Sequence, residues 1–155
     1  MIFVTIGTQA PFDRFIKIID EMAPLLNEEI IAQVYKLGYK PKYIKTIDFL
    51  APDEFNELFK KARLIVSHAG MGTIISALQL QKPIIIFPRI AALGEHRNEH
   101  QLATAQKFRE LGSVYVAMNE EELKNLLLRK DLKLLQEIGE RASENLIKSI
   151  EDFIG

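Results

Sequence analysis

The stretch VSHAGMGTIISAL, residues 66–78, decides the fold class. It joins the end of an apolar run to the start of a helical pattern, and Gly70 and Gly72 stand at the junction. This junction is typical of a strand that leads into a helix whose free backbone N–H groups bind an anion. The third glycine of a dinucleotide-binding fingerprint is missing, because Ile75 occupies its position, and so is the Gly-Lys-Ser/Thr ending of a P-loop. The stretch therefore predicts a diphosphate site and argues against a nicotinamide or flavin enzyme.

Strand and helix patterns alternate outward from this junction along the whole chain. Short β-branched and apolar runs predict strands at residues 2–6, 30–35, 64–67, 84–87 and 113–117, and a weaker β-like pattern predicts another at 43–50. Several of these runs are uninterrupted, as expected for strands buried on both faces. Amphipathic spacing predicts helices at residues 12–22, 52–61, 72–80, 98–111, 120–129 and 132–154, with a polar loop at 89–97. The alternation predicts a single α/β domain over residues 1–155 with a doubly wound, Rossmann-like parallel sheet.

The composition excludes several classes of function. The 155 residues contain no cysteine, which rules out disulfides, zinc–thiolate sites and thiol catalysis. The net charge of -1 gives no sign of nucleic-acid binding. The first residues, MIFVTIG, lack the features of a signal peptide, and no apolar run is long enough to span a bilayer. We expect a cytoplasmic protein.

Two loops after predicted strands carry the chemistry of a phosphate site. Open α/β sheets bind ligands beyond the carboxyl ends of their strands, where these loops meet. The first loop has Gly7, which lets backbone approach a ligand closely, and Thr8, which adds a hydroxyl. The second holds His68, whose ring could contact phosphate or a neighbouring loop.

Two further loops offer polar and aromatic groups. Glu95, His96 and His100 could be proposed as metal ligands, but their order is not H-E-x-x-H, and a polar cluster at a helix start more often binds a sugar or phosphate or only caps the helix. Phe49 stands beside Leu50, whose backbone is expected to be extended and free, so this loop could hold a planar base or belong to the core.

Four segments in combination resemble a known family: residues 3–8 with 12–13, residues 67–74, residues 82–84 with 88–89, and residues 98–101. They resemble the C-terminal, nucleotide-sugar-binding domain of family 28 glycosyltransferases, and above all the single-domain catalytic subunits of two-component enzymes. The resemblance implies the UDP-sugar-binding half of an inverting GT-B glycosyltransferase that needs no metal or other cofactor. It also implies a membrane-anchored acceptor-binding subunit of the PssD/EpsD type, with which this chain would form a heterodimer at the inner face of the membrane. The product would be exopolysaccharide or another glycan built on a lipid-linked acceptor.

The resemblance further implies roles for individual residues. It assigns the nucleotide to Gly7, Thr8, Phe49, Leu50, His68, Gly70, Met71, Gly72, Thr73 and Ser76. It assigns the donor sugar to Arg89, Glu95, Asn98, His100 and Gln101. Ser76 stands where larger relatives carry a ribose-binding glutamate, so a nucleotide other than UDP stays open. The catalytic base is expected from the partner, so this chain would hold no complete catalytic set and would be inactive, or nearly so, alone.

Alternatives remain open at this stage. A non-catalytic nucleotide-sugar-binding regulatory module would use the same residues. A nucleotide-sugar epimerase or dehydrogenase is disfavoured, because the chain lacks a Tyr-x-x-x-Lys pair. The amphipathic helix expected at residues 132–154 could pack on its own sheet or dock the acceptor-binding subunit.

Overall fold

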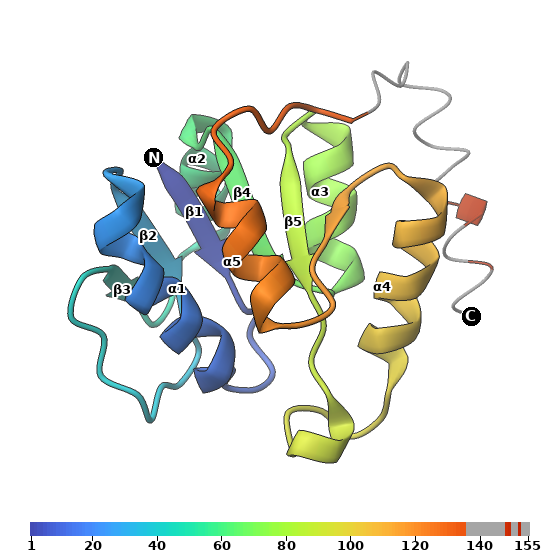
Figure 1. The fold of residues 1–155 in the computed structure, drawn as a ribbon, viewed down its shortest axis with the longest axis horizontal. Helices are drawn as coiled ribbons and strands as arrows, with labels where there is room; N and C mark the ends of the chain where they lie inside the picture. The colour runs from blue at the N-terminus through green and yellow to red at the C-terminus, as the bar shows by residue number, and fades with distance from the viewer. Residues whose placement is uncertain (136–147, 150–151, 153–155) are drawn as a thin grey trace.

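The computed structural model describes residues 1–135, 148–149 and 152, and these contain one parallel sheet (Figure 1). Its strands are β1 (Ile2–Thr5), β2 (Ile30–Gln33), β3 (Lys45–Ile47), β4 (Leu64–His68), β5 (Ile84–Phe87) and β6 (Tyr115–Val116). They lie in the order β3-β2-β1-β4-β5-β6, and every neighbouring pair is parallel. The predicted doubly wound, Rossmann-like sheet is therefore confirmed.

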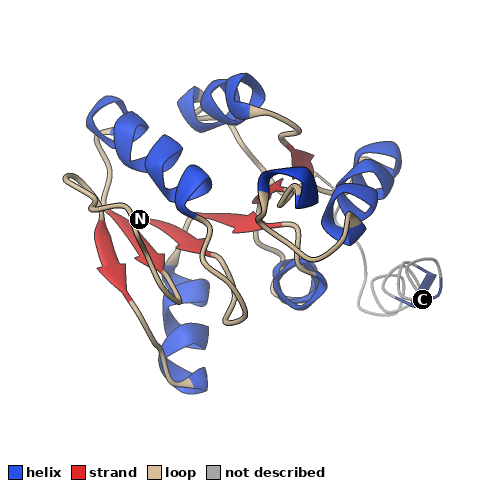
Figure 2. Cartoon of the chain, turned by 90° about the horizontal axis from the view of Figure 1, so that it is seen from below, coloured by secondary structure: helices blue, strands red, loops and turns tan. Residues whose placement is uncertain are grey.

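Helices cover both faces of the sheet, which explains why its strands are apolar throughout (Figures 1 and 2). One face packs against α1 (Asp13–Leu26) and α5 (Glu120–Leu128). The other packs against α2 (Pro52–Lys61), α3 (Met71–Gln79) and α4 (His100–Leu111). Along β1, Ile2 and Val4 point to the first layer, whereas Phe3 points to the second and meets the ring of Phe55 at 5.3 Å between centroids.

Several predicted boundaries are wrong. β3 and β6 are shorter than the predicted strands at 43–50 and 113–117. The helix predicted from Asn98 begins at His100, because the Asn98 side-chain oxygen accepts a hydrogen bond from the His100 N–H at 3.0 Å and closes a turn before the helix. The polar loop at 89–97 contains a short 3-10 helix, η1 (Ala91–Leu93). Most of the helix predicted at 132–154 lies outside the described residues.

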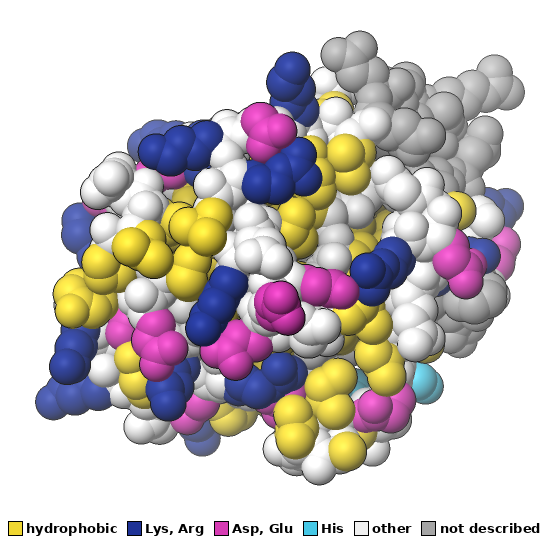
Figure 3. Space-filling model, in the orientation of Figure 1, with side chains coloured by type: hydrophobic (Ala, Val, Ile, Leu, Met, Phe, Trp, Pro, Cys, Tyr) yellow, Lys and Arg dark blue, Asp and Glu magenta, His cyan; other side chains and the backbone are white. Residues whose placement is uncertain are grey.

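The surface over α1 and α5 is mixed in charge. Figure 3 shows acidic and basic side chains interspersed on this face, in keeping with the net charge of -1. No helix within the described ranges combines the length and the apolar character that crossing a membrane requires.

One buried carboxylate holds the long connection between β2 and β3. Asp20 on α1 is 1% exposed and accepts hydrogen bonds from the Tyr39 hydroxyl at 2.6 Å and from the backbone N–H groups of Lys42, Tyr43 and Ile44 at 2.8–3.3 Å. Burial alone would raise the pKa of Asp20, but these hydrogen bonds outweigh it and lower the pKa below its ordinary value. The carboxylate thus fixes the segment that leads into the edge strand.

Replacing this carboxylate should destabilise the fold. Asp20→Ala would leave four buried or half-buried donors without an acceptor, and we expect a loss of about 3 kcal/mol in the free energy of unfolding. Urea unfolding measures the loss. The neighbouring Glu21→Ala, at an exposed position, is the control and should change stability by less than about 0.5 kcal/mol. Equal stability of the two variants would show that Asp20 does not anchor the connection.

Candidate functional site

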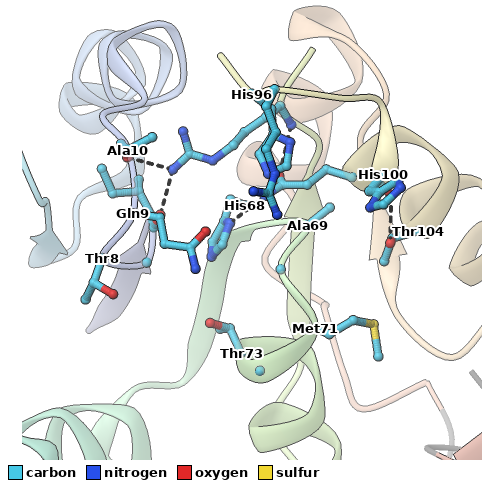
Figure 4. Close-up of a pocket in the computed structure, with 17 residues that line it drawn as sticks. Thr8, Gln9, Ala10, His68, Ala69, Met71, Thr73, His96, His100 and Thr104 are labelled. Atoms are coloured by element: carbon cyan, nitrogen blue, oxygen red, sulfur yellow. Dashed lines mark hydrogen bonds between the residues drawn. The ribbon is translucent and has the colours of Figure 1, made fainter. Parts of the chain in front are cut away.

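A cavity of about 600 Å³ opens at the carboxyl ends of β1 and β4 (Figure 4). These strands are neighbours, and the strand order reverses between them, which is where open α/β sheets bind ligands. The volume is in the range of small-molecule sites. Ten of the predicted site residues line it: Gly7, Thr8, His68, Gly70, Met71, Gly72, Thr73, Arg89, His100 and Gln101.

The start of α3 presents free donors to this cavity. Gly70 is the N-cap, in an extended conformation, and no side chain caps the helix. The first helical hydrogen bond runs from Ile74 N–H to Gly70 O at 3.2 Å, so the N–H groups of Met71, Gly72 and Thr73 have no acceptor within the helix. These N–H groups and the helix dipole favour an anion at this point.

Two of the glycines are required by the ring of His68. Gly7 has a φ of +74°, and a Cβ built on it would lie 3.1 Å from His68 Nε2. A Cβ on Gly70 would lie 2.2 Å from His68 Cε1, closer than atoms can approach. A Cβ on Gly72 would meet nothing within 4 Å. Gly7 and Gly70 therefore make room for a side chain of the protein, whereas Gly72 faces open space.

Arg89 joins the loops that form two walls of the cavity. Its guanidinium is buried and donates to the backbone oxygens of Ile6 and Pro11 at 2.7 Å, of Ala10 at 2.8 Å and of Glu95 at 3.3 Å. It also lies over the ring of Phe12, 4.7 Å from the centroid. Arg89 was predicted to face the donor sugar, but these contacts engage it with the protein itself.

The side chain of Gln101 is likewise bound by groups of the protein itself. Its side-chain oxygen accepts a hydrogen bond from the Arg89 backbone N–H at 3.1 Å, and its side-chain nitrogen lies 3.1 Å from His68 Nδ1. Burial, followed by electrostatic repulsion from Arg89 and His96, lowers the pKa of His68 to about 3. His68 is therefore neutral near pH 7, and it can offer a ligand a hydrogen bond but no positive charge.

Two residues that were predicted to bind the sugar or the nucleotide have their hydrogen-bond partners outside the cavity. Glu95 pairs with Arg14 through two contacts of 2.8 Å and also accepts from the Ile90 N–H at 3.0 Å. Ser76 donates to the Gly72 carbonyl at 3.0 Å, one turn back along α3. The structure brings neither side chain to the cavity wall.

The predicted base-binding loop also lies apart from the cavity. Phe49 follows β3 and is 73% exposed, and Leu50 packs on the core layer of α2, α3 and α4. Asn98 closes the turn before α4 and does not line the cavity.

The sequence reasoning missed several lining residues, among them Gln9, Arg97 and Thr104. Thr104 lies four residues after His100 on α4, so helical periodicity would have placed both on one face. Figure 4 shows Gln9, His68 and Thr73 reaching toward the same part of the cavity from three segments. Arg97 is exposed and has no ion-pair or hydrogen-bond partner in the described part of the chain.

Metal ligation has no geometric support among residues 1–135, 148–149 and 152. They contain no group of three or more His, Asp or Glu side chains that could hold a metal ion. The candidate set of Glu95, His96 and His100 is not assembled, since Glu95 is bound by Arg14.

Sequence comparisons place the chain among glycosyltransferase domains. A family model described as "Glycosyltransferase family 28 C-terminal domain" matches residues 1–154. The UDP-N-acetylglucosamine transferase subunit ALG13 of Candida albicans is 33% identical over 85 residues, which cover 54% of this chain and 28% of that protein. The Homo sapiens protein of the same name is 27% identical over 125 residues, which cover 74% of this chain and 11% of that protein. The chain spans less than half the length of the curated relatives it matches.

Structural comparisons agree on the fold. The NMR solution structure of ALG13 matches with a TM-score of 0.63 at 22% identity, over 94% of each chain. The crystal structure of Acinetobacter baumannii MurG matches with a TM-score of 0.54 at 19% identity, over 97% of this chain and 51% of that one. The Streptomyces glycosyltransferase SsfS6, complexed with thymidine diphosphate, matches with a TM-score of 0.57 at 17% identity, over 97% and 37%.

Alanine substitutions should distinguish Gly70, which adjoins the ring of His68, from Gly72, which faces open space. Gly70→Ala would force His68 to move and should destabilise the fold by about 1–3 kcal/mol. Gly72→Ala meets open space and should change stability by less than about 0.5 kcal/mol. Denaturant unfolding of both variants measures the difference, and a destabilisation by Gly72→Ala as large as that by Gly70→Ala would contradict the assignment.

Burial of neutral His68 should make the fold sensitive to acid. The unfolded chain takes up a proton on this ring below about pH 6.5, whereas the folded chain does so only at about pH 3. Between these two pH values, acidification therefore lowers the free energy of unfolding by up to about 1.4 kcal/mol for each pH unit. Below about pH 3, His68 makes no further contribution. Between about pH 6.5 and pH 3, the free energy of unfolding of the wild type should fall more steeply on acidification than that of His68→Gln. Above this range, the two free energies should differ by a constant amount. Parallel curves throughout would show that the buried ring is not protected from protonation.

Proposed function

The chain belongs to the family of glycosyltransferase family 28 C-terminal domains, and on this basis we propose that it is the donor-binding catalytic subunit of a UDP-sugar-dependent glycosyltransferase. One observation carries the proposal: the uncapped start of α3 opens onto a cavity of about 600 Å³ at the point where the strand order reverses. The relatives' name, UDP-N-acetylglucosamine transferase subunit, supports a UDP-sugar as the donor.

The diphosphate of the donor would lie at the start of α3. The N–H groups of Met71, Gly72 and Thr73 and the Thr73 hydroxyl would donate to its oxygens. In an inverting transfer, the acceptor oxygen attacks the anomeric carbon from the opposite face, and the bond to the diphosphate breaks with its electron pair. The leaving diphosphate gains negative charge as that bond breaks, and fixed backbone donors stabilise it without reorganising.

The sugar and the uracil ring of the donor would extend in different directions from the diphosphate at the start of α3. His100 lines the cavity and stays the predicted sugar contact. Arg97 also lines it and has no hydrogen-bond or ion-pair partner within residues 1–135, 148–149 and 152, so its cation would be available to the donor. The role of Phe49 and Leu50 in holding uracil, and that of Ser76 near the ribose, stay predictions, because the cavity does not reach these side chains.

The catalytic base would come from a second chain. Within the described residues, the cavity lining contains no Asp or Glu, and His68 is a poor base because its Nδ1 is occupied and its pKa is lowered. We expect a membrane-anchored acceptor-binding subunit of the PssD/EpsD type, which would hold this chain at the cytoplasmic membrane face and present a lipid-linked acceptor. Exopolysaccharide synthesis is the proposed setting. Binding of a UDP-sugar without transfer in any pairing would favour the regulatory-module alternative.

Blocking the start of α3 should abolish nucleotide binding and transfer together. Gly72→Leu would place a side chain where the diphosphate is proposed to lie, and UDP affinity measured by titration calorimetry should fall by more than about tenfold. Transfer from a UDP-sugar, assayed with the acceptor-binding subunit present, should be lost in the same variant.

Gln79→Leu places the same side chain at the opposite end of α3 and serves as the control. It should bind UDP like the wild type, and both variants should melt near the wild-type temperature. Unchanged UDP affinity in Gly72→Leu would mean that the diphosphate is bound elsewhere.

A further inference from the structure

We propose that Gln101 is a positioning residue, whose amide holds His68 as a neutral ring with its proton on Nε2, so that this N–H donates to the phosphate of the bound donor. The residue thus acts through the histidine and not as a direct ligand of the sugar. The part that concerns the phosphate rests on the proposed function, whereas the part that concerns the ring stands on contacts within the chain.

The backbone of Arg89 fixes which way the amide of Gln101 points. A backbone N–H can only donate, and the Arg89 N–H lies 3.1 Å from the side-chain oxygen of Gln101. The amide oxygen must therefore face Arg89, and the NH2 group must face His68. Arg89 cannot easily shift, because its guanidinium is held by four backbone oxygens.

The amide in turn fixes the proton on the ring. The Gln101 NH2 group lies 3.1 Å from His68 Nδ1, and two facing N–H groups repel, so Nδ1 must be the unprotonated acceptor. The neutral ring then carries its proton on Nε2. A second proton on Nδ1 would break this contact. This agrees with the lowered pKa of His68, to which burial and electrostatic repulsion from Arg89 and His96 also contribute.

The geometry directs the remaining N–H into the ligand site. Built Cβ atoms on Gly7 and Gly70 would lie 3.1 Å and 2.7 Å from Nε2, so this atom stands between the loop after β1 and the start of α3. His68 lines the cavity, and Nε2 has no acceptor among the described residues. A neutral donor at this point adds a hydrogen bond to those of the helix start.

The first arm of the test determines which ring nitrogen of His68 carries the proton. Long-range 1H–15N correlation spectra of the labelled chain distinguish protonation at Nδ1 from protonation at Nε2, and His68→Gln identifies the signal among the three histidines. We expect Nε2–H in the wild type. Gln101→Glu keeps an acceptor for Arg89 but places a carboxylate oxygen against Nδ1, so the ring should gain a proton on Nδ1.

Gln106→Glu is the matched control for this arm. It adds the same charge to the same helix at an exposed position and should leave the His68 signal unchanged. A wild-type ring protonated on Nδ1, or a ring that keeps its Nε2–H form in Gln101→Glu, would overturn the proposal.

The second arm is a double-mutant cycle on UDP affinity. Gln101→Leu and His68→Phe should each weaken binding by about tenfold, and the double variant should bind no more weakly than His68→Phe alone. Additive losses would mean that Gln101 contacts the ligand itself and would overturn the proposal. Failure of the wild type to bind UDP would refute the proposed function and with it the phosphate contact, while the spectra still decide the assignment of the ring. Thermal melting checks that each variant is folded.

Discussion

The site depends on one buried cation, the guanidinium of Arg89. It joins the loop after β1 to the loop after β5 through the oxygens of Ile6, Ala10, Pro11 and Glu95. A buried charge without partners is costly, so these oxygens stabilise the guanidinium as much as it orders them. Because both loops form walls of the cavity, its shape follows from this set of contacts.

Aromatic side chains of the hydrophobic core also contact the Arg89 guanidinium. The Arg89 guanidinium lies over the ring of Phe12, which stacks on Phe15 at 5.1 Å and on Phe87 at 5.8 Å between centroids. These rings come from α1, β5 and the loop before α1, so the layer that packs α1 on the sheet also contacts the Arg89 guanidinium.

The sequence predicted the helices and strands better than it predicted the side-chain contacts. Apolar runs and the paired glycines depend on local patterns, and the structure confirms the parallel sheet that they predicted. Arg89 binds oxygens in the loop after β1, and Glu95 pairs with Arg14. These partners lie 78 to 83 residues away along the chain, and no local pattern signals such contacts. Gly70 was assigned to ligand approach, but its lack of a side chain is required by His68, two residues before it, which only the folded turn reveals.

The charges around the cavity explain why the proposed enzyme would be divided between two chains. A diphosphate at the start of α3 would repel a carboxylate about 4 Å away by about 1–4 kcal/mol, depending on the local dielectric. The acidic groups near the cavity are accordingly engaged elsewhere: Glu95 pairs with Arg14, and Glu99 accepts from the Ala91 N–H. A base strong enough to deprotonate a hydroxyl is best placed on the far side of the sugar, away from the diphosphate. An acceptor-binding chain is free to carry that base without weakening donor binding, which gives a physical reason for the lack of Asp and Glu in the described cavity lining.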